Sequence, residues 1–189
     1  MDKKILLIID CQYDFLDGGK LGVNGSIEKV NNLIEYITQK GDEYEVIIAT
    51  KDWHPISHCS FNINGGIWPI HCLQHSKGSA IYEPLLIALN SFSRHFEVLT
   101  KGINDDHEEY SIFKNDESSE KIKKLVENFG ITQIDVCGVA LDYCVKDTLY
   151  DAKRALPQVK VVLLKDFSPA IGNQDEILKE IENMNFEII

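Results

Sequence analysis

The chain lacks any long hydrophobic run. None of the apolar stretches in its 189 residues approaches the roughly 18 residues that a membrane-spanning helix requires. The N-terminus also lacks a signal-peptide pattern, because the strand-like segment 3–9 follows the first two residues directly. We therefore expect a cytoplasmic protein that does not bind or cross a membrane.

Basic clusters are also missing. The sequence has 19 Lys and Arg residues against 30 Asp and Glu residues, so its formal net charge at pH 7 is −11. Nucleic acids and anionic membrane surfaces attract basic patches and repel an acidic surface. This balance argues against both as partners and leaves the substrate itself open.

Paired cysteine motifs are absent as well. The chain has no CxxC spacing of the kind found in structural zinc modules. An odd number of cysteines fits reduced thiols better than a disulfide framework. The five cysteines are Cys11, Cys59, Cys72, Cys137 and Cys144.

The pattern of apolar residues predicts an alternation of strands and helices. Six apolar runs predict strands at residues 5–9, 46–49, 96–99, 134–136, 159–164 and 186–189. Helical spacing predicts helices at residues 26–40, 120–129, 142–155 and 174–184. The expected N-caps are Ser26 for the first helix, Ser118 or Ser119 for the second, and Asp142 for the third.

These elements predict an α/β fold. The strands are apolar throughout rather than at alternate positions, which is typical of a sheet buried on both faces. We predict a six-stranded, mainly parallel sheet with helices on both faces, a Rossmann-type three-layer sandwich. The length and the 44% of hydrophobic residues suit one domain over residues 1–189.

Residues 51–82 break this rhythm. The segment is rich in Gly, Pro, Asn, Ser and His and shows no clear periodicity. A loop of that length inside a compact domain usually serves a function. It holds four of the six histidines, namely His54, His58, His71 and His75.

Chemically useful side chains follow four of the predicted strands. Asp10 follows the first strand, Asp52 and His54 the second, and Lys101 the third, while Cys144 follows the fourth. Ligands bind beyond the carboxyl ends of the strands in an open parallel sheet. A thiol beside an ammonium and a carboxylate makes a nucleophilic site, because the ammonium lowers the thiol pKa and the carboxylate can carry the proton.

Each of these residues also has a structural interpretation. Asp10 could cap a turn, Lys101 could be a surface lysine, and Cys144 could be a small buried hydrophobe. Their joint placement at the strand ends favours the catalytic hypothesis. Cys144 in addition lies in the first turn of the helix that Asp142 is expected to cap, where free N–H groups and the helix dipole favour a thiolate.

The loop also contains a candidate metal site. Asp52 and His54 are two residues apart, so an extended chain would point both to the same side. His71 is the natural third ligand, and the set suits zinc, iron or manganese. His58 could ligate the ion or hydrogen-bond to one of its ligands. Surface positions are expected for the remaining histidines, His75, His95 and His107.

Six ordered motifs resemble the nicotinamidases of the isochorismatase-like cysteine hydrolase superfamily. The motifs are IIDCQYDF, DWHPISHCSF, WPIHCLQHSKG, the KG pair at 101–102, YSIF and CGVALDYCV. The chain departs from the family pattern at Leu141, where threonine is frequent, and at Glu109, where aspartate is common before the Tyr-Ser pair. The segment 73–78 is also less typical.

The resemblance implies a role for each matching residue. It implies a catalytic triad of Asp10, Lys101 and Cys144, and an oxyanion hole formed by the N–H groups of Ala140 and Cys144. It implies metal ligation by Asp52, His54 and His71, and a pyridine pocket formed by Phe15, Trp68 and Tyr110. It also implies a cis peptide between Val139 and Ala140.

The implied reaction is metal-dependent hydrolysis of nicotinamide to nicotinate and ammonia through a thioester on Cys144. Pyrazinamide is an expected second substrate, and NAD salvage is the expected setting. One divalent ion is implied, zinc before iron or manganese, and a homo-oligomer is compatible with the sequence.

Two alternatives stay open at this point. A relative in the same superfamily could act on an N-carbamoyl compound or an isochorismate-like ether, although such relatives generally lack the aspartate and histidine ligands. The chain could instead be a metal-binding redox sensor in which Cys144 is oxidised.

Overall fold

A single parallel sheet organises the computed structural model, which describes residues 3–189. Its strands are β1 (Lys4–Ile9), β2 (Val46–Asp52), β3 (Phe96–Lys101), β4 (Gln133–Gly138), β5 (Lys160–Leu163) and β6 (Glu187–Ile188). The spatial order is β3-β2-β1-β4-β5-β6, and every neighbouring pair is parallel. The predicted six-stranded α/β fold is confirmed.

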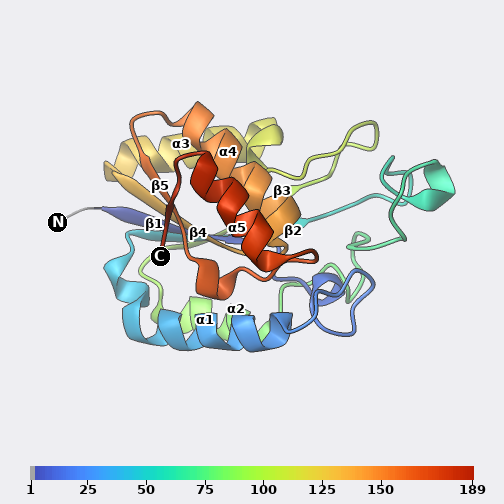
Figure 1. Ribbon diagram of the computed structural model, residues 1–189, viewed down its shortest axis with the longest axis horizontal. Helices are drawn as coiled ribbons and strands as arrows, with labels where there is room; N and C mark the ends of the chain where they lie inside the picture. The colour runs from blue at the N-terminus through green and yellow to red at the C-terminus, as the bar shows by residue number, and fades with distance from the viewer. Residues whose placement is uncertain (1–2) are drawn as a thin grey trace.

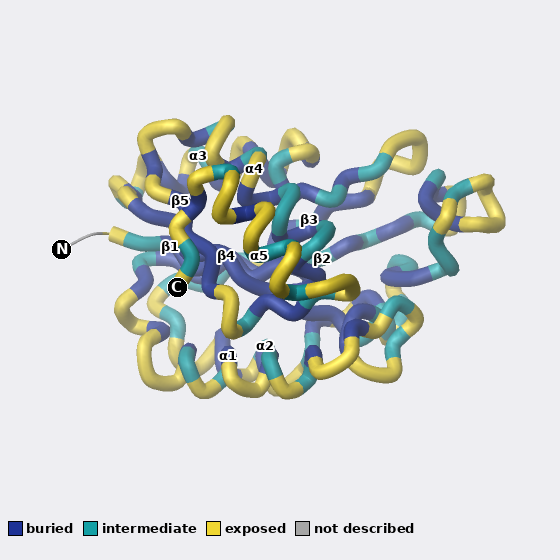
Figure 2. Tube along the Cα trace, in the orientation of Figure 1, coloured by how far each residue is buried: buried dark blue, intermediate teal, exposed yellow. Residues whose placement is uncertain are grey.

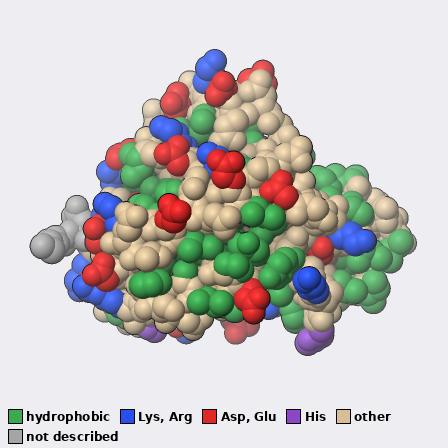
Figure 3. Space-filling model, turned by 90° about the horizontal axis from the view of Figure 1, so that it is seen from below, with side chains coloured by type: hydrophobic (Ala, Val, Ile, Leu, Met, Phe, Trp, Pro, Cys, Tyr) green, Lys and Arg blue, Asp and Glu red, His purple; other side chains and the backbone are tan. Residues whose placement is uncertain are grey.

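Helices cover both faces of the sheet (Figure 1). Within residues 3–189 the α-helices are α1 (Ser26–Lys40), α2 (Glu83–Phe92), α3 (Asp116–Phe129), α4 (Lys146–Ala155) and α5 (Gln174–Asn183). Helices α1 and α2 pack on one face, and α3, α4 and α5 pack on the other. On the α1 and α2 side, the surface intersperses Lys and Arg with acidic and apolar side chains (Figure 3).

Strand β1 shows why a central strand of this sheet can be apolar along most of its length. Ile5, Leu7 and Ile9 belong to the core beneath α3, α4 and α5, whereas Leu6 and Ile8 belong to the core beneath α1 and α2. Successive side chains of a strand point to opposite faces, so a strand between two helical layers needs apolar residues at both. Figure 2 accordingly shows a buried sheet between outer helix surfaces that are exposed.

The direction in which successive strands are added to the sheet reverses between β1 and β4. The chain builds β1, β2 and β3 to one side and then returns to place β4 on the other side of β1. This switch point leaves a crevice outside the carboxyl ends of the two strands. Ile9 and Gly138 are paired there, so the residues that follow them, including Asp10 and the turn with Cys144, come together.

The N-caps predicted for α1 and α3 are wrong. Ser26 is the first helical residue of α1, and the Asp17 carboxylate accepts hydrogen bonds from its hydroxyl and from the N–H of Ile27. Helix α3 begins at residue 116, and its N-cap Asn115 accepts from the N–H of Ser118 at 3.1 Å. Ser118 and Ser119 are helical residues.

Helix α2 is not among the predicted helices. Pro84 stands in its first turn, where a proline needs no backbone donor, and Leu85, Ala88 and Leu89 form its buried side. Residues 53–82 are otherwise irregular, as predicted, with one short helical turn at Asn62–Asn64. Within residues 3–189, none of the helices has both the length and the apolar character needed to cross a membrane.

Candidate active site

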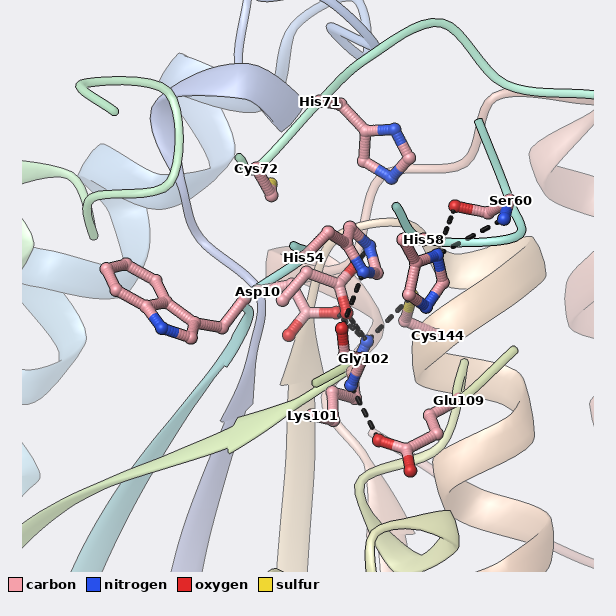
Figure 4. Close-up of polar contacts among 12 residues, drawn as sticks. Asp10, His54, His58, Ser60, His71, Cys72, Lys101, Gly102, Glu109 and Cys144 are labelled. Carbon is pink, nitrogen blue, oxygen red and sulfur yellow. Dashed lines mark hydrogen bonds and ion pairs between the residues drawn. The ribbon is translucent and has the colours of Figure 1, made fainter. Parts of the chain in front are cut away.

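Lys101 stands at the centre of the side chains that follow β1, β2, β3 and β4. Its Nζ atom lies 2.7 Å from Asp10 Oδ2, 2.6 Å from Asp52 Oδ1 and 3.5 Å from Cys144 Sγ (Figure 4). The lysine is fully buried, and Thr50 donates a hydrogen bond to the other Asp10 oxygen at 2.7 Å. The structure therefore brings together the three side chains expected to form a triad.

Burial and the paired charges set the protonation of this cluster. Burial lowers the pKa of Lys101, but Asp10 and Asp52 outweigh it and hold that pKa well above its usual range. Burial raises the pKa of Asp10 above its ordinary value, against the opposing charge of Lys101. Lys101 is therefore a permanent cation here.

The thiol of Cys144 does not behave as its position in the sequence suggests. Burial raises its pKa well above the ordinary value, and the neighbouring Lys101 only partly offsets this effect. Lys101 lowers the pKa of this thiol, as expected, but burial opposes it and has the larger effect. A buried thiol with a raised pKa needs a base to remove its proton before it can act as a nucleophile.

The turn that carries Cys144 also differs from the expected helix start. Leu141–Val145 form a π-helical turn, in which the Val145 N–H donates to the carbonyl of Ala140 at 3.1 Å. Asp142 is not the N-cap, because its carboxylate accepts the N–H groups of Ile171 and Gly172 at 3.1 and 2.9 Å. The Val139–Ala140 peptide is cis, as the resemblance implies.

Leu141 packs away from the site. Its side chain is fully buried in the core beneath α3, α4 and α5, and its N–H donates to the carbonyl of Pro169 at 2.9 Å. Ala140 and Cys144, by contrast, line the cavity. Leu141, which departs from the family pattern, is therefore not among the residues that line the cavity.

A cavity opens to solvent beside Cys144. The three residues expected to form a ring pocket, Phe15, Trp68 and Tyr110, all line it. Trp68 Nε1 donates to the Tyr110 hydroxyl at 3.0 Å. Tyr143, which the sequence analysis missed, packs edge-on against both, with ring centroids at 5.4 and 5.6 Å. The cavity thus offers flat aromatic walls beside the thiol.

Asp52, His54 and His71 form a donor set that fits a divalent ion. Each offers one ligand atom, and these atoms lie within 4.8 Å of one another. His54 Nδ1 is 2.9 Å from the carbonyl of Gly102, and His71 Nδ1 is 2.8 Å from that of Pro69. A carbonyl only accepts, so both Nδ1 atoms carry the proton and both Nε2 atoms keep a lone pair for a metal.

The environment of His54 supports the same assignment. Its Nε2 atom is fully buried, lies 3.5 Å from Asp52 Oδ2 and has no hydrogen-bond partner within residues 3–189. Burial raises the pKa of Asp52, but opposing effects, led by the charge of Lys101, hold that pKa well below its ordinary value. Asp52 therefore offers one anionic oxygen to Lys101 and the other to the histidines.

His58 is held in a different tautomer. The backbone N–H of Ser60 donates to His58 Nδ1 at 3.2 Å, and the Ser60 hydroxyl lies 2.7 Å from the same atom (Figure 4). Because a backbone N–H only donates, Nδ1 is an acceptor and neutral His58 carries its proton on Nε2. Burial and then the nearby His54 lower the pKa of His58 to about 4.

Glu108 is a further site residue that the sequence analysis missed. It lines the cavity, and a carboxylate oxygen lies within 4.8 Å of ligand atoms of His54 and His58. Burial raises its pKa, and the charge of Asp52 adds to this effect. No periodic pattern marks residues 103–109, so the only available signal was proximity to the Tyr-Ser pair.

The remaining histidines and cysteines match their expected environments. His75 and His107 are exposed, and His95 is partly exposed. All five cysteines are free.

A buried cysteine at the switch point of a parallel sheet, beside an aromatic cavity with metal donors, is the arrangement of an α/β cysteine hydrolase. The family comparison makes this class specific. An isochorismatase domain model matches residues 4–187, so the chain belongs to the isochorismatase family.

Several known proteins are similar over nearly the whole chain. The nicotinamidase/pyrazinamidase of Mycobacterium tuberculosis is 32% identical over 192 residues, which cover 98% of each chain. The structure of the Pyrococcus horikoshii pyrazinamidase in complex with zinc is 30% identical, with a TM-score of 0.86 over 99% of this chain and 98% of that one. PnC1 from L. infantum in complex with nicotinate has the same identity and TM-score, over 99% and 92%. The resemblance seen in the motifs is confirmed.

Proposed function

We propose that this protein is a metal-dependent nicotinamidase that hydrolyses nicotinamide to nicotinate and ammonia through a thioester on Cys144. One observation carries the proposal: the thiol of Cys144 and two of the metal donors, Asp52 and His71, line one aromatic cavity, and Lys101 links the thiol to Asp52. Asp52 is in contact with Lys101 on one side and His54 on the other. The relatives named for nicotinamide and pyrazinamide hydrolysis support the same substrate class.

Asp52, His54 and His71 would hold the ion. When bound, a divalent cation supplies a Lewis-acid centre to which the pyridine nitrogen of the substrate can bind, directly or through water. Zinc is our first choice, because two imidazoles and a carboxylate suit it and a similar pyrazinamidase structure contains it. We assign His58 as a hydrogen-bond donor beside the ion, since its Nε2 carries the proton.

Asp10 serves as the proton carrier. It takes the thiol proton of Cys144 as the sulfur attacks the amide carbon, and it later delivers that proton to the departing nitrogen, which leaves as ammonia. Its raised pKa suits a base that must hold a proton between these two steps. Lys101 keeps the carboxylate in place and supplies positive charge beside the sulfur.

The backbone N–H groups of Ala140 and Cys144 donate hydrogen bonds to the developing oxyanion. A donor of this kind typically contributes about 3 to 4 kcal/mol to transition-state stabilisation. A water molecule then attacks the thioester, with Asp10 as its base, and Cys144 regains its proton as nicotinic acid leaves. Nicotinic acid gives up its carboxyl proton to the ammonia released in the first half-reaction, so the final products are nicotinate and ammonium.

The cavity walls set the substrate class. Phe15, Trp68 and Tyr110 surround a flat ring, and Tyr143 closes one side. A second ring nitrogen in place of a C–H changes little in the shape of the ring, so we propose pyrazinamide as a further substrate. The single-domain organisation, the cytoplasmic setting and the role in NAD salvage are part of this proposal.

An ammonia-release assay with nicotinamide tests the function. The purified protein is assayed as isolated, after treatment with a chelator, and after zinc is restored. We expect release that the chelator abolishes and zinc recovers. Absence of release in the zinc-loaded protein would overturn the proposal and leave a different amide or ether substrate or a redox role for Cys144. A thiol-oxidation assay would then divide those two.

A further inference from the structure

Gly102 is held at both of its backbone polar groups. Its N–H donates to Glu109 Oε2 at 2.6 Å, and its carbonyl accepts from His54 Nδ1 at 2.9 Å (Figure 4). Gly102 follows Lys101 directly at the end of β3. One glycine therefore links a buried carboxylate to a candidate metal ligand.

The His54 ring rests against the α-carbon of Gly102. A Cβ atom at this position would lie 2.3 Å from His54 Cε1 and 2.6 Å from Nδ1. The glycine also has φ +66°, in the left-handed region that other residues rarely adopt. Any displacement of Gly102 would therefore move both the hydrogen bond and the packing surface of the imidazole.

Several polar groups hold the Glu109 carboxylate in place. Its side chain has no exposed surface, and Oε2 also accepts from Asn115, the N-cap of α3, at 3.3 Å. Asn104 donates to Oε1 at 2.8 Å, and His107 Nε2 lies 3.2 Å from the same oxygen. A buried carboxylate is costly unless its oxygens are satisfied, and here both are.

We propose that Glu109 is a positioning residue for the metal centre. It fixes Gly102, and the Gly102 carbonyl in turn fixes the orientation and tautomer of His54, with Nδ1 protonated and Nε2 free to ligate. Groups that orient a metal-ligating histidine typically change metal affinity 10- to 100-fold when mutated. The inference rests on the proposed role of His54 as a ligand.

Two substitutions at Glu109 separate the effect of where its oxygens lie from the effect of its charge. Glu109→Asp keeps the charge but shortens the side chain by one methylene, so its oxygens withdraw from the Gly102 N–H. Glu109→Gln removes the charge but keeps the length and one oxygen for that N–H. Positioning predicts that the aspartate variant is the more impaired of the two, whereas a purely electrostatic role predicts the reverse order.

The test uses the full-length apoprotein, so that it is independent of nicotinamide turnover. Zinc affinity is measured by competition with a chromophoric chelator, and the His54 tautomer is read from side-chain ¹⁵N shifts in the absence of metal. We expect Glu109→Asp to weaken zinc binding tenfold or more. The protonated Nδ1 signal of His54 should also give way to a mixture of tautomers. Glu109→Gln should stay nearer to wild type in both.

Two further variants calibrate the result. Gly102→Ala displaces the imidazole directly and should weaken zinc binding at least as much as Glu109→Asp. Asp135→Asn perturbs another buried carboxylate, which accepts from Tyr44 and Gln133 and is nearly unexposed. It should lower the unfolding temperature while zinc affinity and the His54 tautomer stay at wild-type values.

The outcomes are distinguishable. Wild-type zinc affinity and tautomer in a folded Glu109→Asp protein would overturn the inference and leave the metal site intact, as would a greater loss in Glu109→Gln than in Glu109→Asp. If the aspartate variant does not fold, Gly102→Ala carries the test, and an unchanged tautomer there would refute the link to His54. A wild-type apoprotein that bound no zinc would remove the metal role itself.

Discussion

The ammonium nitrogen of Lys101 lies 3.5 Å from the sulfur of Cys144, and the lysine has no exposed surface. The same ammonium forms ion pairs with Asp10 and Asp52. Its positive charge therefore acts on two carboxylates as well as on the sulfur. Burial consequently prevails at Cys144 and keeps the thiol protonated. In the proposed mechanism, the sulfur therefore attacks only as its proton passes to Asp10.

Replacing Cys144 with alanine should abolish turnover and spare binding. The substitution removes the sulfur, while the aromatic walls and the metal donors stay in place. We expect ammonia release from nicotinamide to fall to the limit of detection, with nicotinamide still bound in a calorimetric titration. Substantial turnover in this variant would refute the assignment of the nucleophile.

The histidines of the loop should differ in their effect on metal content. His54→Ala removes a nitrogen whose lone pair is free to ligate, so the purified protein should contain much less metal by elemental analysis. His58→Ala should lower metal content less, because its Nε2 carries a proton. His75→Ala, at an exposed position, is the matched control and should leave metal content unchanged. Wild-type metal content in His54→Ala would count against the ligand set.

Asp17 should make stability depend on pH. Hydrogen bonds from the backbone N–H groups of Ile27 and Gly25 lower its pKa below the ordinary 3.8 in the folded protein. A lowered folded-state pKa stabilises the protein above pH 3.8, and this contribution disappears as the pH falls through the folded-state value. Asp17→Asn should therefore unfold at a lower temperature than wild type at pH 7. The difference between the two unfolding temperatures should shrink as the pH falls below 3.8.

Thermal unfolding followed by circular dichroism across pH 2.5–7 measures this effect within the range in which refolding is reversible. Asp42→Asn removes the charge of an exposed aspartate and is measured over the same range as the control. An equal offset for Asp17→Asn at every pH would show that the charge of Asp17 does not contribute.

Gly138 should tolerate no side chain. Its φ is +123°, and a Cβ atom there would lie 2.1 Å from the carbonyl oxygen of Ile9 on the neighbouring strand. We expect Gly138→Ala to lower the free energy of unfolding by about 3 kcal/mol or more, from backbone strain and overlap together. Gly130→Ala, which has φ +64° and open space around the position, should lower it by only about 1 to 2 kcal/mol. Denaturant titrations give both values, and equal losses would show that contact with Ile9 is unimportant.

The sequence by itself determined most of the sheet and the set of chemically active residues. The apolar runs identify the strands because burial on both faces can leave a continuous hydrophobic signal, as in β1. Asp10, Lys101 and Cys144 could be grouped in advance because parallel strands direct their carboxyl ends to one edge. Both inferences depend on local patterns that can be read directly from the amino-acid sequence.

Only the tertiary structure decided the contacts between residues distant along the chain. Asp17 caps α1 from outside the helix, and Asp142 binds the backbone 29 and 30 residues further along the chain instead of capping its own turn. The protonation of Cys144 follows from its burial, which outweighs the lysine charge that the sequence brings near it. The tautomers of His54 and His58 depend on which partner each Nδ1 meets, Gly102 or Ser60. Hydrogen-bond direction and desolvation are properties of three-dimensional surroundings, so no local pattern encodes them.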